Sequence, residues 1–217
     1  MKKPLIIFLV VLIIAIAIVV GLTVYYEGRM VDQSGNQIAT STENVLITYR
    51  NETYGFEIKH PEDWKVEIDE RIPGIHIYKI EDTKPDYLTH HNNFTHVSIY
   101  PEGIGTEGVR GITASTTVNF SAPVRQPFDY VLENGTHWAT FAGMESAPDS
   151  WQEWGYIWSG VEIENLETYC IDNGQRRPAD SCDIGLEAAG AQIIQSGTIN
   201  LEDRKIEETI LSSFKFI

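Results

Sequence analysis

The chain has 217 residues and a formal net charge of −15, with 31 acidic and 16 basic side chains. This excess of negative charge argues against nucleic acid as a partner, because phosphate backbones are bound through clustered Lys and Arg. The hydrophobic share of 42% is enough for a globular domain with its own core.

The first predicted element is an apolar segment at residues 5–24, which follows Lys2 and Lys3. At about 1.5 Å rise per residue it spans the roughly 30 Å hydrocarbon core of a bilayer. Residues 1–26 are therefore predicted to be an uncleaved transmembrane signal anchor, with a cleaved signal peptide as the alternative. The two lysines favour a cytoplasmic amino terminus, which predicts a single-pass protein of the cell membrane with an extracytoplasmic C-terminal domain.

A polar segment follows at residues 27–44, rich in Ser, Thr, Asn and Gln. It has no apolar period, which predicts a flexible stalk. Residues 45–217 are long enough for one domain with its own core and too short for two comfortable ones. We therefore expect a single folded domain at 45–217.

Strand periodicity dominates this domain. Apolar and polar residues alternate at 54–58 and again at 64–68, and the turn residues at 60–63 predict a hairpin between the two segments. A second hairpin is expected between 128–132 and 137–141, because Asn134-Gly135 separates two apolar runs. The other expected strands are residues 75–80, 95–100, 114–120, 155–163 and 192–199.

Two cysteines, Cys170 and Cys182, flank a segment of turn residues. In an oxidising compartment this spacing predicts a disulfide, which would stabilise the fold by about 3 kcal/mol on the chain-entropy model. A metal-binding pair is the alternative, but no second Cys or His couple stands at ligand spacing.

One helix is expected at the end of the chain. Asn200 is a suitable N-cap, and Ile206, Ile210, Leu211 and Phe214 fall on one helical face. Many strands and a terminal helix with one apolar stripe predict an α+β fold, in which the helix lies across a mainly antiparallel sheet.

The two ends of the domain resemble a known family. Residues 54–64 read Tyr-Gly-Phe-x-Ile-x-x-Pro-x-x-Trp, and residues 210–216 are similar to the ending Ile-Leu-x-Ser-Phe-x-Phe. Both motifs are typical of the PsbP-like domain superfamily and of related anchored bacterial proteins of unknown function. The resemblance implies an α/β/α sandwich with helices packed against an antiparallel sheet. It also implies a module that binds partners rather than one that catalyses.

An aromatic cluster at residues 151–158 is the strongest sign of a ligand site. On a strand, Trp154, Tyr156 and Trp158 would share one face. An open face of this kind could stack against sugars or a protein partner, whereas a covered one would be core packing, which the sandwich architecture favours.

Residues for catalysis or metal binding are harder to find. No Gly-x-Ser-x-Gly, His-Glu-x-x-His or phosphate-binding glycine motif is present, and no cofactor is indicated. His90, His91 and His96 form a weak metal candidate, with solvated loop histidines as the favoured interpretation. Asn51, Asn93, Asn119 and Asn134 begin glycosylation acceptors, which matter only where that pathway exists.

The sequence therefore predicts a membrane-anchored, extracytoplasmic binding or interaction module of unknown ligand rather than an enzyme. An envelope protein or a glycan is the expected partner. One alternative is a hydrolase or carbohydrate binder that acts on glycans through the Trp154 face. The other is weak metal binding at the three histidines.

Overall fold

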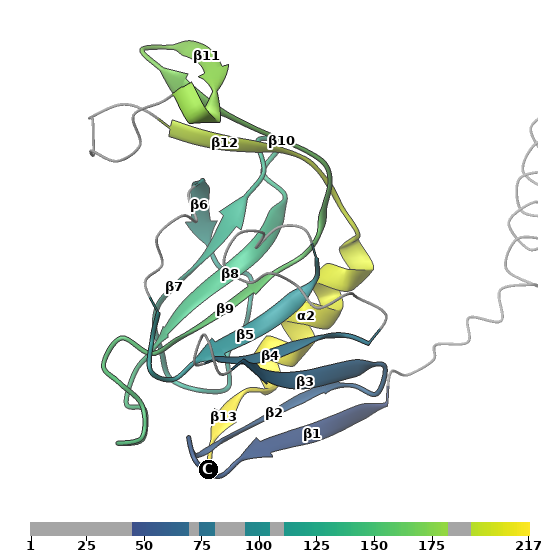
Figure 1. The fold of residues 1–217 in the computed structure, drawn as a ribbon, viewed down its shortest axis with the longest axis vertical. Helices are drawn as coiled ribbons and strands as arrows, with labels where there is room; N and C mark the ends of the chain where they lie inside the picture. Colours follow the sequence, from purple (N-terminus) through teal and green to yellow (C-terminus); the bar gives the residue numbers. More distant parts are fainter. Residues whose placement is uncertain (1–44, 70–73, 81–93, 105–110, 182–191) are drawn as a thin grey trace, which may run out of the picture. The chain divides into compact units, whose positions relative to one another are not determined.

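The structure is a computed structural model, and it describes residues 45–69, 74–80, 94–104, 111–181 and 192–217. All of them belong to one compact unit, Val45–Ile217. In this part of the chain the fold consists of three antiparallel sheets, one α-helix and a short 3-10 helix, η1 (Ala179–Ser181) (Figure 1).

The largest sheet has seven strands in the order β3-β4-β5-β9-β8-β7-β6. In chain order these strands are β3 (Trp64–Asp69), β4 (Gly74–Lys79), β5 (His96–Tyr100), β6 (Ile112–Ser115), β7 (Val124–Val131), β8 (His137–Met144) and β9 (Tyr156–Gly160). Every neighbouring pair is antiparallel.

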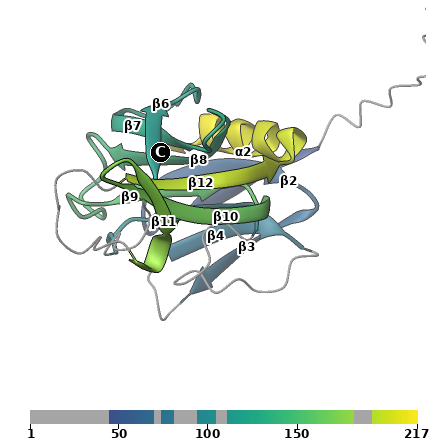
Figure 2. The ribbon, with the colours of Figure 1, turned by 90° about the horizontal axis from the view of Figure 1, so that it is seen from above.

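Two smaller sheets complete the fold. One joins β1 (Leu46–Asn51), β2 (Phe56–Pro61) and β13 (Lys215–Phe216), and the other joins β11 (Gln175–Pro178), β10 (Ile163–Asp172) and β12 (Gln192–Ile199). The long β10–β12 ribbon extends, with β11, from the middle of the domain to the end opposite to β1 and the C-terminus (Figure 1). Seen from above, it crosses over the other strands (Figure 2).

The helix α2 (Leu201–Ser213) begins as the sequence predicts. The side chain of Asn200 accepts a hydrogen bond from the backbone of Glu202, which satisfies one of the free N–H groups of the first turn. The helix contributes Ile210 and Leu211 to a core that is completed by Phe214, and all three are fully buried. This core fills the space between α2 and one face of the large sheet.

The opposite face of the large sheet carries a second, aromatic core. Its largest buried members are Tyr78, Tyr100, Trp138, Tyr156 and Trp158. Ile163 of β10 and Ile199 of β12 pack against these rings. Strands and aromatic side chains therefore cover this face where a second layer of helices was expected.

The predicted fold class is accordingly wrong. The expected α+β fold, an α/β/α sandwich with packed helices, is replaced by a mainly β structure with a single α-helix among the described residues. The cause lies in the middle of the domain, because segments without helical periodicity form strands β5 to β11. The PsbP-like resemblance itself stays an expectation.

The predicted strands are largely present, but one predicted pairing is wrong. The segments at 54–58 and 64–68 form β2 and β3, yet β2 pairs with β1 and β13 while β3 pairs with β4. Both edges of β2 are thus occupied, so it cannot form the expected hairpin with β3. The hairpin across Asn134-Gly135 is confirmed as β7 and β8, with Gly135 at a φ of 82°.

The expectation of a single-pass membrane protein is corrected as well. Within the described residues no helix is long and apolar enough to cross a bilayer. The helix α2 has 13 residues, which gives it a length of about 20 Å at 1.5 Å per residue. The predicted anchor at 1–26 and the predicted stalk at 27–44 lie outside the described residues. Membrane attachment and an extracytoplasmic location are therefore not carried forward.

Candidate functional site

A bulge in β7 creates the most distinctive surface feature of the domain. Arg125 lies opposite Gly143 of β8, and Phe128 lies opposite Phe141, so three residue steps on β7 match two steps on β8. The extra residue, Gln126, has a positive φ of 47°. Side chains three positions apart normally point to opposite faces of a strand. The bulge brings Arg125 and Phe128 to the same face.

The residues across from these two continue onto β9. Gly143 is paired with Tyr156, and Phe141 is paired with Trp158. The rings of Phe128 and Phe141 stack at a centroid distance of 5.2 Å, and those of Phe141 and Tyr156 stack at 5.0 Å. A continuous aromatic wall thus runs across three strands, with Gly143 beside it as a position that has no side chain.

A pocket of about 340 Å³ opens above this wall. Its lining residues are Ile104, Arg125, Gln126, Phe128, Phe141, Gly143, Trp154, Gly155 and Tyr156. The volume is at the lower end of the range of small-molecule sites, which are mostly apolar with a few polar groups. Arg125 is the only charged residue among the described residues that line it.

Trp154 forms the exposed rim of this pocket. It is 63% exposed, yet its indole Nε1–H donates a hydrogen bond to the backbone carbonyl of Glu102 at 2.6 Å. The ring also lies against Gly103, where a Cβ atom would come within 1.9 Å of the Trp154 Cδ1 atom. The indole is therefore held in a fixed orientation while much of its surface stays in contact with solvent.

The electrostatics of the pocket are simple. Burial, together with the neighbouring Tyr100, raises the pKa of Tyr156 well above its ordinary value, so this ring keeps its hydroxyl proton. Arg125 donates one hydrogen bond from Nη2 to the backbone carbonyl of Glu153 at 3.2 Å. No carboxylate of a described residue forms an ion pair with it. The pocket thus combines aromatic surface with one positive charge.

The predicted ligand face divides in the structure. Tyr156 and Trp158 lie on the same face of β9 but are only 5% and 3% exposed, so they belong to the aromatic core. Trp154 precedes the strand and remains exposed. The sequence thus identified one wall of the pocket and missed Arg125, Phe128, Phe141 and Gly143. The bulge that gathers them leaves no simple signal in the alternation pattern.

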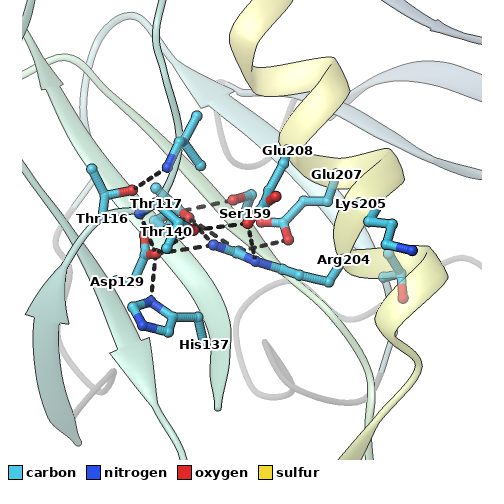
Figure 3. Close-up of polar contacts among 12 residues, drawn as sticks. Thr116, Thr117, Asp129, His137, Thr140, Ser159, Arg204, Lys205, Glu207 and Glu208 are labelled. Carbon is cyan, nitrogen blue, oxygen red and sulfur yellow. Dashed lines mark hydrogen bonds and ion pairs between the residues drawn. The ribbon is translucent and has the colours of Figure 1, made fainter. Parts of the chain in front are cut away.

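A second cluster, entirely polar, lies on the other face of the same sheet (Figure 3). Asp129, Thr140 and Ser159 occupy paired positions on β7, β8 and β9 and are essentially fully buried. Arg204 and Glu207 of α2 reach down to them and are also buried. Helix and sheet therefore meet through a charged layer in addition to the apolar core.

Arg204 is the centre of this layer. Its guanidinium contacts Asp129 at 3.0 Å, Glu207 at 2.7 Å and, at the surface, Glu208 at 3.1 Å. It also donates to the Thr140 hydroxyl at 3.1 Å from both terminal nitrogens. These carboxylates raise the pKa of Arg204 despite its burial, so the side chain stays charged.

The pKa values of the two buried carboxylates, Asp129 and Glu207, shift in opposite directions in this environment. Burial alone would raise the pKa of Asp129, but hydrogen bonds from Thr116, Thr140 and the Thr117 backbone, with the charge of Arg204, lower it below its ordinary value. Burial dominates at Glu207 and raises its pKa to about 7, although Arg204 and the Ser159 hydroxyl oppose the shift. Glu207 therefore titrates near neutrality and Asp129 stays ionised.

His137 extends the cluster toward solvent. Its Nδ1 atom lies 2.8 Å from Asp129, and its side chain is 28% exposed. An aspartate beside a histidine is part of the machinery of many hydrolases, but that chemistry also requires a nucleophile on the histidine. No hydroxyl or thiol of a described residue is hydrogen-bonded to His137. The arrangement supports a structural pair better than a hydrolytic one.

The predicted metal histidines are only partly within the described chain. His90 and His91 lie outside it, and His96 is buried with its ring stacked on Phe94 at 4.4 Å. Among the residues that can be described, no group of three His, Cys, Asp or Glu side chains is placed to hold a metal ion. His96 is thus a core residue in this structure.

The expected disulfide is not found between described residues. Cys170 is fully buried near the end of β10, and Cys182 lies outside the described residues. The pairing of Cys170 with Cys182 therefore stays a prediction of the sequence.

Comparison with models of protein families, with curated proteins and with solved structures finds no match to this chain. The function must therefore be argued from the geometry of the domain itself.

Proposed function

We propose that this protein is a small-molecule binding module, whose ligand places a ring against Trp154 and the aromatic wall of Phe128, Phe141 and Tyr156. The observation that carries this proposal is Trp154 itself. A tryptophan that is 63% exposed contributes little to the core, yet a short hydrogen bond and contact with Gly103 fix its orientation. A rigid, flat and exposed ring at the rim of a pocket suits the recognition of another ring.

A glycan hydrolase at the same position is less well supported. Glycoside hydrolysis normally uses two carboxyl groups about 5 to 9.5 Å apart beside the bound sugar. None of the described residues that line the pocket carries a carboxylate. Sugar binding stays compatible with the pocket, because the apolar face of a sugar ring can rest on an indole.

The test uses the full chain and ring-bearing probes of two kinds, 2-naphthamide for aromatic rings and N-acetylglucosamine for sugars. A ligand of this size gains roughly 0.3 kcal/mol per heavy atom, which gives a Kd on the order of 1 mM. Binding in this range is measured in every variant by NMR titration that follows the resonances of the probe, and in chains that keep Trp154 its indole N–H is a second reporter. The spectrum of Trp154→Ala identifies that resonance by its absence.

We expect at least one probe to shift the Trp154 resonance, and Trp154→Ala to weaken its binding about fivefold, since a stacked ring pair contributes roughly 1 kcal/mol. Leu201→Ala is the matched control, because Leu201 is similarly exposed at 61% but belongs to α2. If no ring-bearing probe of any charge binds, or if both variants bind like the unmodified chain, the proposal is wrong.

A further inference from the structure

Arg125 differs from every other arginine in the described part of the chain. Arg50, Arg176, Arg177 and Arg204 each form an ion pair with a carboxylate. Arg125 forms none with any described residue, although the chain as a whole has 31 acidic and only 16 basic side chains. In such an acidic protein, a guanidinium without an acidic partner is unexpected on electrostatic grounds.

The bulge in the backbone of β7 determines the position of Arg125. It lies next to the bulge at Gln126, a non-glycine residue with a φ of 47°. Backbone of this kind is strained for a residue with a side chain and is found preferentially at functional sites. The side chain extends over Gly143, with Nε 3.7 Å from the point where a Cβ atom of that residue would lie.

One end of the guanidinium is anchored while the rest remains available. Nη2 donates to the Glu153 carbonyl, in the residue next to Trp154. No other hydrogen bond from Arg125 to a described residue is present. A guanidinium presents its N–H groups in a planar fork that matches the oxygens of a carboxylate or phosphate.

We propose that the ligand of this pocket is an anion, a ring compound whose carboxylate or phosphate group binds Arg125 while its ring rests against Trp154 and Phe141. This inference depends on the proposed binding function and adds the charge of the ligand to it. The same chemistry is offered by an aromatic acid and by a sugar acid, and the experiment separates these two sources.

The test compares probes that differ in charge at constant shape, using the full chain in the NMR titration described above. The first pair is 2-naphthoate and 2-naphthamide, and the second is glucuronate and glucuronamide. We expect one of the two acids to bind at least about tenfold more tightly than its neutral partner, which corresponds to a charge-assisted hydrogen bond. The pair that shows the preference identifies the source of the ring.

The variant Arg125→Gln should remove this preference, so that within this variant the acid and the neutral probe bind with about the same affinity. Arg125→Lys should keep part of the preference, because it retains the charge and loses the planar fork. Arg50→Gln on β1 is the matched control and should keep the full preference. Thermal unfolding of each variant verifies that the fold is intact.

The outcomes are separable. If neutral probes bind through Trp154 but neither acid is preferred, or if Arg125→Gln keeps the preference, the inference of an anionic ligand is overturned while the binding function stands. If no probe of either charge binds, the proposed function fails, and this inference fails with it.

Discussion

The two faces of the seven-stranded sheet differ in how the charge of their arginine side chains is paired. On the face toward α2, Arg204 is buried and its guanidinium contacts Asp129, Glu207 and Thr140. On the other face, Arg125 is exposed at a pocket and has no carboxylate partner among the described residues. The two faces are separated by one peptide bond in β7, because Asp129 points to the helix and its neighbour Phe128 lines the pocket.

The difference separates a structural role for charge from a binding role. A buried ion pair must be almost completely satisfied, since an unpaired charge in the interior costs several kcal/mol. The Arg204 guanidinium meets this requirement, because it is paired with Asp129, Glu207 and Glu208, while the Oε1 atom of Glu207 has no hydrogen-bond partner among the described residues. This arginine therefore has little capacity left for an anionic ligand. The pocket at Arg125 retains that capacity, and its exposure keeps the cost of an unpaired charge low. Variants in the two regions should therefore affect different properties, stability in the first and ligand binding in the second.

The largest effect is expected at Arg204. Arg204→Met keeps much of the side-chain volume but leaves Asp129 and Glu207 without their cation in the interior. We expect a loss of about 3 to 5 kcal/mol in the free energy of unfolding, measured by chemical denaturation at pH 7. The control Lys205→Met changes the adjacent residue, whose side chain is 67% exposed and paired with Glu202. It should change stability by less than about 1 kcal/mol.

A similar stability for both methionine variants would contradict the structural role of the Arg204 cluster. It would mean that the apolar core around Ile210 and Leu211 holds the helix without the charged layer.

The next largest effect concerns pH. The raised pKa of Glu207, about 7 instead of the ordinary 4.5, means that the folded state holds a proton that the unfolded state has released. Stability is therefore expected to fall as the pH rises from about 4.5 to about 7, by about 3 kcal/mol in total at 1.36 kcal/mol for each pKa unit. Glu207→Gln removes this titration, and its stability should be nearly constant over the same interval.

Asp129 gives an internal reference for this measurement. Its lowered pKa makes its contribution to stability present above the ordinary value of 3.8 and lost as the pH falls through the lower pKa of the folded state. The loss of stability at acidic pH should be the same in the unmodified chain and in Glu207→Gln. A decline between pH 5 and 7 that persists in Glu207→Gln would show that Glu207 is not its cause.

The smallest effect on stability, and the sharpest test of the pocket, comes from Gly103→Ala. A Cβ atom there would overlap the Trp154 ring, and the φ of 66° is unfavourable for alanine. We expect a loss of about 1 kcal/mol from the backbone, together with displacement of the indole and loss of probe binding in the NMR titration. Gly174→Ala has a similar φ of 76° and open space around it, so it should lose stability without losing binding. Equal binding in both variants would show that the orientation of Trp154 is unimportant.

Local structure was largely predictable from the sequence, and strand pairing was not. The strand at 192–199 agrees with β12, and the Asn200 cap and the Asn134-Gly135 turn are confirmed, because each depends on neighbours within a few residues. The partner of β2 could not be predicted in this way. Its edge is filled by β13, more than 150 residues away in the chain, and such contacts depend on tertiary packing rather than on local pattern.

The candidate site shows the same division. The aromatic residues at 151–158 indicated a ligand site, and Trp154 is at the rim of the pocket. Arg125 stands 29 positions earlier, on a strand where regular alternation would turn it away from Phe128. The polar cluster was missed for a related reason, since Asp129 and Arg204 are 75 positions apart and neither belongs to a recognisable motif.

The extra residue in β7, Gln126, decides on which face of the sheet Arg125 lies. Removal of Gln126 would restore simple alternation along the strand and turn Arg125 toward the opposite side of the sheet from Phe128. One inserted codon in an ordinary hairpin is thus enough to bring a cation beside an aromatic wall. On the proposed function, closely related chains that carry or lack this codon would therefore differ in the charge of the ligands they accept while keeping the same architecture.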